Sequence, residues 1–117
     1  MAFSYNALSQ RTQIARYQST GTTNAVATTN FTYDYANRLD GIAHKQGTTN
    51  LNTYAYTYVP LSRLKTVNST AGGLTSYSCN VTSLLTGATN TGTAHETYGY
   101  DANGNRNTTG YTVTPDN

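Results

Sequence analysis

Acid–base chemistry has one compact candidate in this sequence, the adjacent pair His95 and Glu96. A second histidine, His44, stands beside Lys45 and far from the first. The chain contains no His-Glu-x-x-His motif or other paired spacing that would place two histidines on one metal ion. We therefore expect solvated or strand-face histidines, with no metal ligands and no cofactor.

Carboxylates are the second candidate, because a glycosidase needs two of them about 5–9.5 Å apart. Asp34, Asp40 and Asp101 could supply such a pair. Asp34 and Asp101, however, each follow a tyrosine and precede a short polar stretch. A residue that recurs with a repeated unit is expected to serve that unit, so the sequence predicts no catalytic residue.

The repeated unit consists of two aromatic residues at a spacing of two, an acid or amide, a polar turn, an arginine and an apolar residue. The anchor tyrosines at 5, 33, 58, 77 and 100 are 28, 25, 19 and 23 residues apart, and the copy around Tyr77 is weak. An irregular period near two dozen is typical of repeat architectures. The expected units are 3–28, 31–53, 54–74, 75–97 and 98–117. Their structural anchors are Tyr5, Arg11, Tyr33, Asp34, Arg38, Leu39, Tyr58, Arg63, Leu64, Tyr100, Asp101, Gly104 and Arg106.

Two copies, Tyr33-Asp34-x-x-Asn37-Arg38-Leu39 and Tyr100-Asp101-x-x-Gly104-Asn105-Arg106, resemble the YD repeat, also called the RHS repeat. This family includes bacterial Rhs and wall-associated proteins, shell subunits of insecticidal Tc toxins and animal teneurins. The resemblance implies β-hairpins that spiral into a sheet around a hollow chamber. It also implies a secreted or cell-surface protein whose partners are neighbouring repeats of a larger chain and an encapsulated toxin domain.

Alternating aromatic residues independently indicate strands. Tyr54, Tyr56 and Tyr58 share one face of an extended chain, whereas a helix would scatter them around its axis. Asn103-Gly104 and Asp40-Gly41 are hairpin-turn signals, and residues 21–24, 47–50 and 87–93 are expected links. Residues 13–19 are the only helix candidate and fit a strand equally well. The fold class is therefore all-β, with antiparallel hairpin repeats in a curved, spiralling sheet.

Within each unit, we expect the acid to accept hydrogen bonds from turn amides. The arginine should pair with that acid or stack on a ring. Residues 111–117 resemble the opening of a further copy, so the array is expected to be truncated at one or both ends.

Composition narrows the function further. The 117 residues contain seven Lys or Arg against five Asp or Glu, and the arginines are spread along the chain, so a nucleic-acid partner is not expected. No apolar run approaches the roughly 20 residues of a membrane-spanning helix. The first residues also lack the pattern of a signal peptide.

Cys79 is the single cysteine, which excludes an intrachain disulfide. Low hydrophobicity would also suit disorder, but the regular aromatic residues argue against it.

Three functions remain open, in order of preference: a structural segment of a repeat shell, a carbohydrate-binding or adhesion module, and an enzyme. The second requires accessible, coplanar tyrosines along a groove, and rings packed against neighbouring hairpins would oppose it. The third would have to rely on His95 and Glu96.

Overall fold

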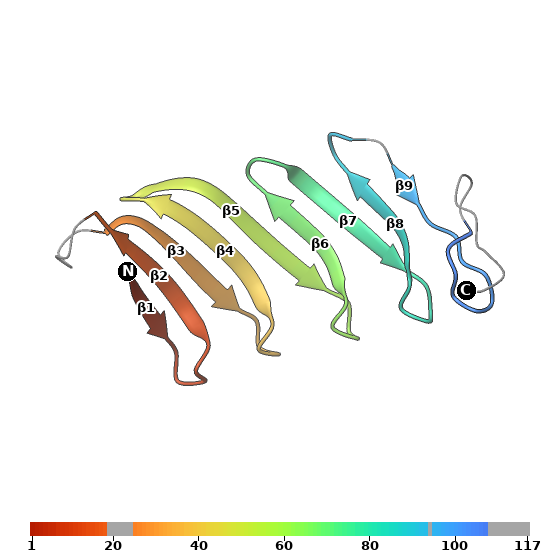
Figure 1. The fold of residues 1–117 in the computed structure, drawn as a ribbon, viewed down its shortest axis with the longest axis horizontal. Helices are drawn as coiled ribbons and strands as arrows, with labels where there is room; N and C mark the ends of the chain where they lie inside the picture. Colours follow the sequence, from red (N-terminus) through yellow and green to blue (C-terminus); the bar gives the residue numbers. More distant parts are fainter. Residues whose placement is uncertain (19–24, 94, 108–117) are drawn as a thin grey trace.

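The computed structural model describes residues 1–18, 25–93 and 95–107, and among these residues nine strands form one open sheet. Every strand pairs antiparallel with the next strand along the chain, so the sheet is a simple meander (Figure 1). The strands are β1 (Ala2–Tyr5), β2 (Arg11–Tyr17), β3 (Ala25–Tyr33), β4 (Leu39–Gln46), β5 (Thr49–Tyr58), β6 (Leu64–Ser69), β7 (Gly73–Cys79), β8 (Leu85–Asn90) and β9 (Glu96–Thr97). The all-β prediction is confirmed.

Local propensity explains why these segments are extended. Threonine and tyrosine, which favour a pleated and half-buried surface, are frequent in the strands, and β5 carries both in alternation. Residues 13–17 of the helix candidate lie in β2. The expected link at 21–24 and the further copy at 111–117 lie outside the described residues.

Two expected connections are instead parts of strands. Asp40 and Gly41 lie inside β4, where the register with β3 shifts between Thr32 and Tyr33. Asp40 accepts a 2.5 Å hydrogen bond from the Thr32 hydroxyl, so it belongs to a β-bulge and not to a turn. Most of the expected link 87–93 is also strand, because β8 continues to Asn90.

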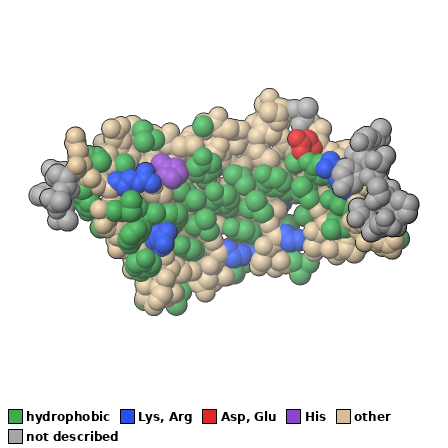
Figure 2. Space-filling view, in the orientation of Figure 1, with side chains coloured by type: hydrophobic (Ala, Val, Ile, Leu, Met, Phe, Trp, Pro, Cys, Tyr) green, Lys and Arg blue, Asp and Glu red, His purple; other side chains and the backbone are tan. Residues whose placement is uncertain are grey.

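The register places ten of the thirteen Phe and Tyr side chains on one side of the sheet. Phe31 lies opposite Ile42, and Tyr56 lies opposite Val67. We call this side the ring-bearing face; its aromatic residues are Phe3, Tyr5, Phe31, Tyr33, Tyr54, Tyr56, Tyr58, Tyr77, Tyr98 and Tyr100. Figure 2 shows hydrophobic side chains gathered along the length of the sheet.

The opposite side is a polar face. Gln13 donates to Asn30 across β2 and β3 at 2.9 Å, and the hydroxyls of Thr57 and Thr66 lie 2.5 Å apart across β5 and β6. Such cross-strand pairs stabilise a sheet without a hydrophobic layer over it.

The described sheet is a single layer. Its only buried hydrophobic residue is Ala15, at 5% exposure, and Phe3 and Tyr5 are 49% and 57% exposed. Domains ordinarily bury a sheet face against a second layer. Here the hydrogen-bonded ladders and the contacts between neighbouring hairpins must hold the sheet together.

Candidate functional site

Five turns of the described chain share one backbone geometry and lie along one edge of the sheet, which we call the turn edge (Figure 1). In the second turn, the Asp34 amide donates to the Arg38 carbonyl at 2.8 Å, and the Asn37 amide donates to the Asp34 carbonyl at 2.9 Å. The equivalent pair of bonds closes each of the other four turns. The fourth residue of every turn has a positive φ: Ser9, Asn37, Ser62, Ser83 and Gly104 at 61°, 62°, 60°, 71° and 84°. This is a β-turn followed by a left-handed residue, a common hairpin connection.

The acid or amide that opens the turn also holds it closed. Asp34 Oδ1 accepts hydrogen bonds from the amides of Ala36 and Arg38, both at 2.9 Å. Asn6, Asn80 and Asp101 make the same two contacts in their turns. The prediction that the acid accepts turn amides is confirmed for Asp34 and Asp101, and the amide oxygens of Asn6 and Asn80 do the same. The third turn has Val59 there, whose side chain has no acceptor atom.

Three anchor tyrosines each connect their hairpin to the one before it. The hydroxyl of Tyr33 donates to the Arg11 carbonyl at 2.9 Å. Tyr58 and Tyr100 repeat this contact with the carbonyls of Leu39 and Leu85, at 2.6 and 2.8 Å. We call this contact the tyrosine bridge.

The bridges lie where the ladders between hairpins have ended. The β4–β5 ladder runs only from Gln46 and Thr49 to Gly41 and Ala55, so Leu39 lies beyond it. The phenol of Tyr58 spans the gap between the two splayed strands. It thereby satisfies a backbone carbonyl that would otherwise lack a ladder partner.

Arg38 binds both within its own unit and to the next one. Its Nε and Nη2 lie 2.8 and 2.7 Å from Asp34 Oδ2, and its Nη1 donates to the Ser62 hydroxyl at 3.2 Å. Its guanidinium also lies over the Tyr58 ring, 4.6 Å from the centroid. Hydrogen bonds from the Arg38 side chain and amide lower the pKa of Asp34 below its usual value.

Arg63 reaches forward in the same way. Its Nη1 donates to the Asn80 carbonyl at 3.1 Å and to the Ser83 hydroxyl at 2.9 Å. Arg38 and Arg63 therefore both connect one turn to the next turn along the edge.

Arg11 and Arg106 occupy a different position in the unit. Relative to their anchor tyrosines they stand where the second copy has Leu39, and Gln10 and Asn105 stand where it has Arg38. Gln10 performs the forward contact in the first unit, with its Nε2 donating to the Asn37 carbonyl at 3.2 Å. Arg11 and Arg106 lie instead over the rings of Phe3 and Tyr98, at 5.3 and 4.4 Å.

The fourth copy matches the repeated unit more closely than its sequence indicated, when it is aligned with the other copies on its turn. Cys79 precedes the turn residue Asn80 and so takes the place of the anchor tyrosine, whereas Tyr77 stands two residues earlier. Anchors at 5, 33, 58, 79 and 100 are 28, 25, 21 and 21 residues apart. The signal that could have found this frame is the amide of Asn80 followed five residues later by Leu85.

The candidates for acid–base chemistry are not brought together. His95 contacts the Thr89 hydroxyl at 2.9 Å, while Glu96 accepts a hydrogen bond from Tyr98 on the ring-bearing face. Neighbouring residues in an extended chain point to opposite sides of the sheet. In the described part of the chain, no three His, Cys, Asp or Glu side chains are grouped so that they could hold a metal ion.

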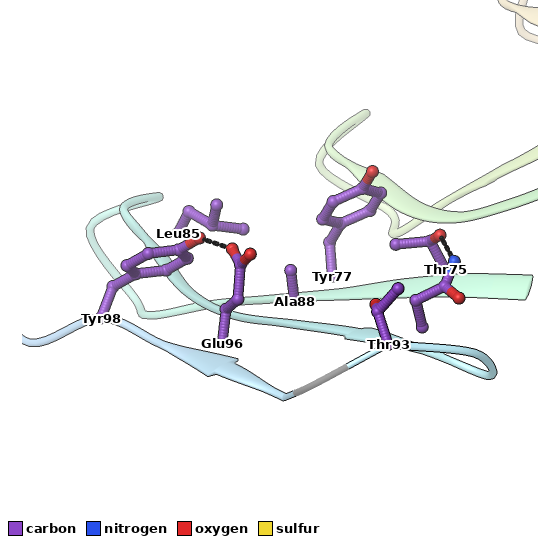
Figure 3. A pocket seen from close by; sticks show the side chains of 8 residues that line it. Thr75, Tyr77, Leu85, Ala88, Thr93, Glu96 and Tyr98 are labelled. Carbon is purple, nitrogen blue, oxygen red and sulfur yellow. Dashed lines mark hydrogen bonds between the residues drawn. The ribbon is translucent and has the colours of Figure 1, made fainter.

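The ring-bearing face has an open hollow of about 320 Å³ near its C-terminal end (Figure 3). Tyr77 and Tyr98 stand on either side of Ala88, whose small side chain leaves the space between them. Polar groups line the same space, namely the Glu96 carboxylate and the hydrogen-bonded pair Asn90 and Thr75. The hydrogen bond to Glu96 raises the pKa of Tyr98.

Comparison with known proteins supports the fold. No protein-family model and no curated protein matches the chain. Among solved structures, a chain in the Tc holotoxin pore of Photorhabdus luminescens superposes with a TM-score of 0.73 over 91% of this chain, at 17% sequence identity. This chain has the fold of a part of that toxin. It spans 6% of the length of the matched chain.

At this identity, the match confirms the YD-repeat resemblance at the level of the fold. The boundaries of the five units remain a prediction. Among the described residues, no helix is long and apolar enough to span a membrane.

Proposed function

We propose that this chain is a non-catalytic structural segment of a secreted or cell-surface YD-repeat protein, forming part of a shell that encloses or presents a toxin or effector domain. The observation that carries this proposal is the repeated connection between hairpins. Three tyrosine hydroxyls and three side chains at the arginine position bind backbone or side-chain atoms of a neighbouring unit.

The shape of the sheet supports the same function. A single layer about 60 Å long, with neither face covered by another layer of the described chain, suits a wall more than an isolated domain. Its partners are neighbouring repeats of a larger chain along the sheet and an encapsulated domain on one side. The similarity to the toxin chain supports the repeated-hairpin sheet. The encapsulated domain is itself part of the proposal.

The test is to clone the whole reading frame that contains this segment and to express its product. We expect further copies of the Tyr-Asp unit on at least one side, and a non-repeat domain that resists added protease while the shell is intact. A reading frame without further copies would reject the shell, and a domain digested as fast as it is in isolation would reject enclosure.

The hollow between Tyr77 and Tyr98 favours a second candidate, a carbohydrate-binding or adhesion module. Two rings, a carboxylate and an amide around one open space offer both stacking surfaces and hydrogen-bonding groups, as ligand sites commonly do. The anchor tyrosines oppose it, because their hydroxyls bind backbone carbonyls and Arg38 covers the ring of Tyr58. Binding is therefore expected at the hollow and not along the whole row of rings.

A glycan array tests this candidate. If a glycan binds, Tyr77→Ala and Glu96→Gln should each abolish the signal. Tyr35→Ala should preserve it, because Tyr35 is 97% exposed in a distant turn. An array with no signal above background would remove the candidate.

A further inference from the structure

The junction between β6 and β7 differs from the β4–β5 junction at both positions that make the connections, and from the other junctions in having no anchor tyrosine. The tyrosine bridge joins Tyr33 to Arg11, Tyr58 to Leu39 and Tyr100 to Leu85. In each bridge the accepting carbonyl belongs to the residue six positions after the preceding anchor. The corresponding acceptor for residue 79 is the carbonyl of Leu64, six positions after Tyr58, but residue 79 is cysteine. A cysteine side chain ends at its sulfur, so it cannot span the gap that a phenol spans.

The β6–β7 ladder leaves the same gap as the others. It runs from Ser69 and Gly73 to Thr66 and Ser76, so Leu64 lies beyond its last pair. In the β4–β5 junction, the ring and hydroxyl of Tyr58 occupy the corresponding gap. The β6–β7 junction therefore has splayed strands without the bridge that elsewhere holds them at the turn edge.

The arginine of this junction also lacks its usual partner. Arg38 is ion-paired with Asp34 in its own turn, but the residue corresponding to Asp34 in the turn of Arg63 is Val59. The Nε of Arg63 is buried and has no hydrogen-bond partner in the described part of the chain. Burying such a donor without a partner is unfavourable.

What remains at the turn edge of β6–β7 is the pair of hydrogen bonds from Arg63 Nη1 to Asn80 and Ser83. The β4–β5 junction has the forward bond from Arg38 to Ser62, the bridge from Tyr58 and the stacking of Arg38 on that ring. We infer that the β6–β7 junction is a hinge built into the wall, where the interior of the sheet opens first and where β1–β6 and β7–β9 can tilt relative to each other.

Residue-resolved amide exchange on the whole 117-residue chain tests the hinge. We expect the β6–β7 ladder amides to exchange about two- to tenfold faster than those of β4–β5, the range that one hydrogen bond accounts for. Equal exchange at the two junctions, including uniformly fast exchange in all ladders, would overturn the inference. The β8–β9 ladder is not the reference, because it is short and lies at the end of the sheet.

Substitutions identify the cause. Cys79→Tyr should slow exchange at β6–β7 by about two- to tenfold relative to Cys79→Phe, which supplies the ring without the hydroxyl. Tyr58→Phe should move the β4–β5 junction toward the faster exchange. If Cys79→Tyr and Cys79→Phe behave alike and Tyr58→Phe has no effect, the tyrosine bridge is not what holds the junctions.

A second measurement does not require a new ring at position 79. Labelling of the half-buried Cys79 thiol by a maleimide reports opening of the junction. Val59→Asp supplies Arg63 with the carboxylate that Arg38 has, so it should slow labelling severalfold relative to Val59→Asn, which can only accept the turn amides. An unchanged labelling rate in Val59→Asp would contradict the role assigned to Arg63.

Discussion

Asp34 performs two separable tasks at the scale of a single residue. Its Oδ1 accepts turn amides, as Asn6 and Asn80 do with an amide oxygen, while its Oδ2 binds Arg38. The first task needs an acceptor and the second needs a negative charge. The chain therefore contains its own comparison between a charged turn and a neutral one.

We predict that Asp34→Asn retains the closed turn and loses only the ion pair, whereas Asp34→Ala loses both and destabilises the chain more. The ion pair is half-buried at the surface of a single-layer sheet and remains in contact with solvent, so its charge contributes little and the first change should be small. Denaturant unfolding of both variants measures the difference. A larger loss for Asp34→Asn than for Asp34→Ala would contradict this division of tasks.

The pH dependence follows from the lowered pKa of Asp34 in the folded chain. A lowered pKa means that the carboxylate stabilises the fold at pH values above its ordinary pKa, near 4. That contribution is lost as the pH falls through the lower, folded-state value. Below about pH 4, the Ala36 and Arg38 amides should lose protection from exchange, while the Thr82 and Leu84 amides bound to Asn80 should not. Parallel loss at both turns would contradict the prediction.

At the scale of the hairpin, the shared turn geometry requires a left-handed residue in fourth position. Serine, asparagine and glycine fill this position in the five turns. A residue with a Cβ adopts this left-handed conformation at a cost of about 1–2 kcal/mol, because the Cβ approaches a carbonyl oxygen, whereas glycine has no such cost. The turn backbone is thus kept even where its residue is not the most favourable one.

We predict that Gly104→Ala lowers the free energy of unfolding by about 1 kcal/mol, while Ser9→Gly causes no loss. Space is not the cause, because a Cβ at Gly104 would meet Leu84 only at 3.9 Å. Chemical denaturation of the two variants tests this. A Gly104→Ala variant as stable as the unmodified chain would show that the fifth turn can relax.

At the scale of the whole molecule, contacts between neighbouring hairpins stabilise the sheet in place of a hydrophobic core. Each hairpin contacts its sequence neighbours, as in other repeat arrays, and the described sheet folds neither face against itself. Stability is then distributed over junctions, and one weak junction changes local opening more than overall architecture.

We predict an elongated particle in solution. The Cα radius of gyration is 19.3 Å, against about 13 Å for a compact domain of this length. Small-angle scattering over a dilution series measures this value and also detects self-association of the open sheet. A concentration-independent radius near 13 Å would show that the sheet folds over onto itself.

The sequence by itself determined the all-β class, the common side of the alternating rings and the turn amide contacts of the acids, because all of these depend on residues within a few positions of one another. The alternation of Tyr54, Tyr56 and Tyr58 indicates an extended strand. The Oδ1 atom of Asp34 accepts from amides two and four residues away. The tertiary structure decided the contacts between units. The bridges of Tyr33, Tyr58 and Tyr100 reach carbonyls 22, 19 and 15 residues away.

Those separations depend on where each ladder stops and how far the strands splay, which local periodicity does not encode. The same reason explains the errors. Asp40-Gly41 has the composition of a turn, but the register with β3 places it in a bulge, and Cys79 is an anchor only because Asn80 opens the turn beside it. Backbone pairing with β3 assigned the first position, whereas the second could have been read from Asn80 and Leu85 in the sequence.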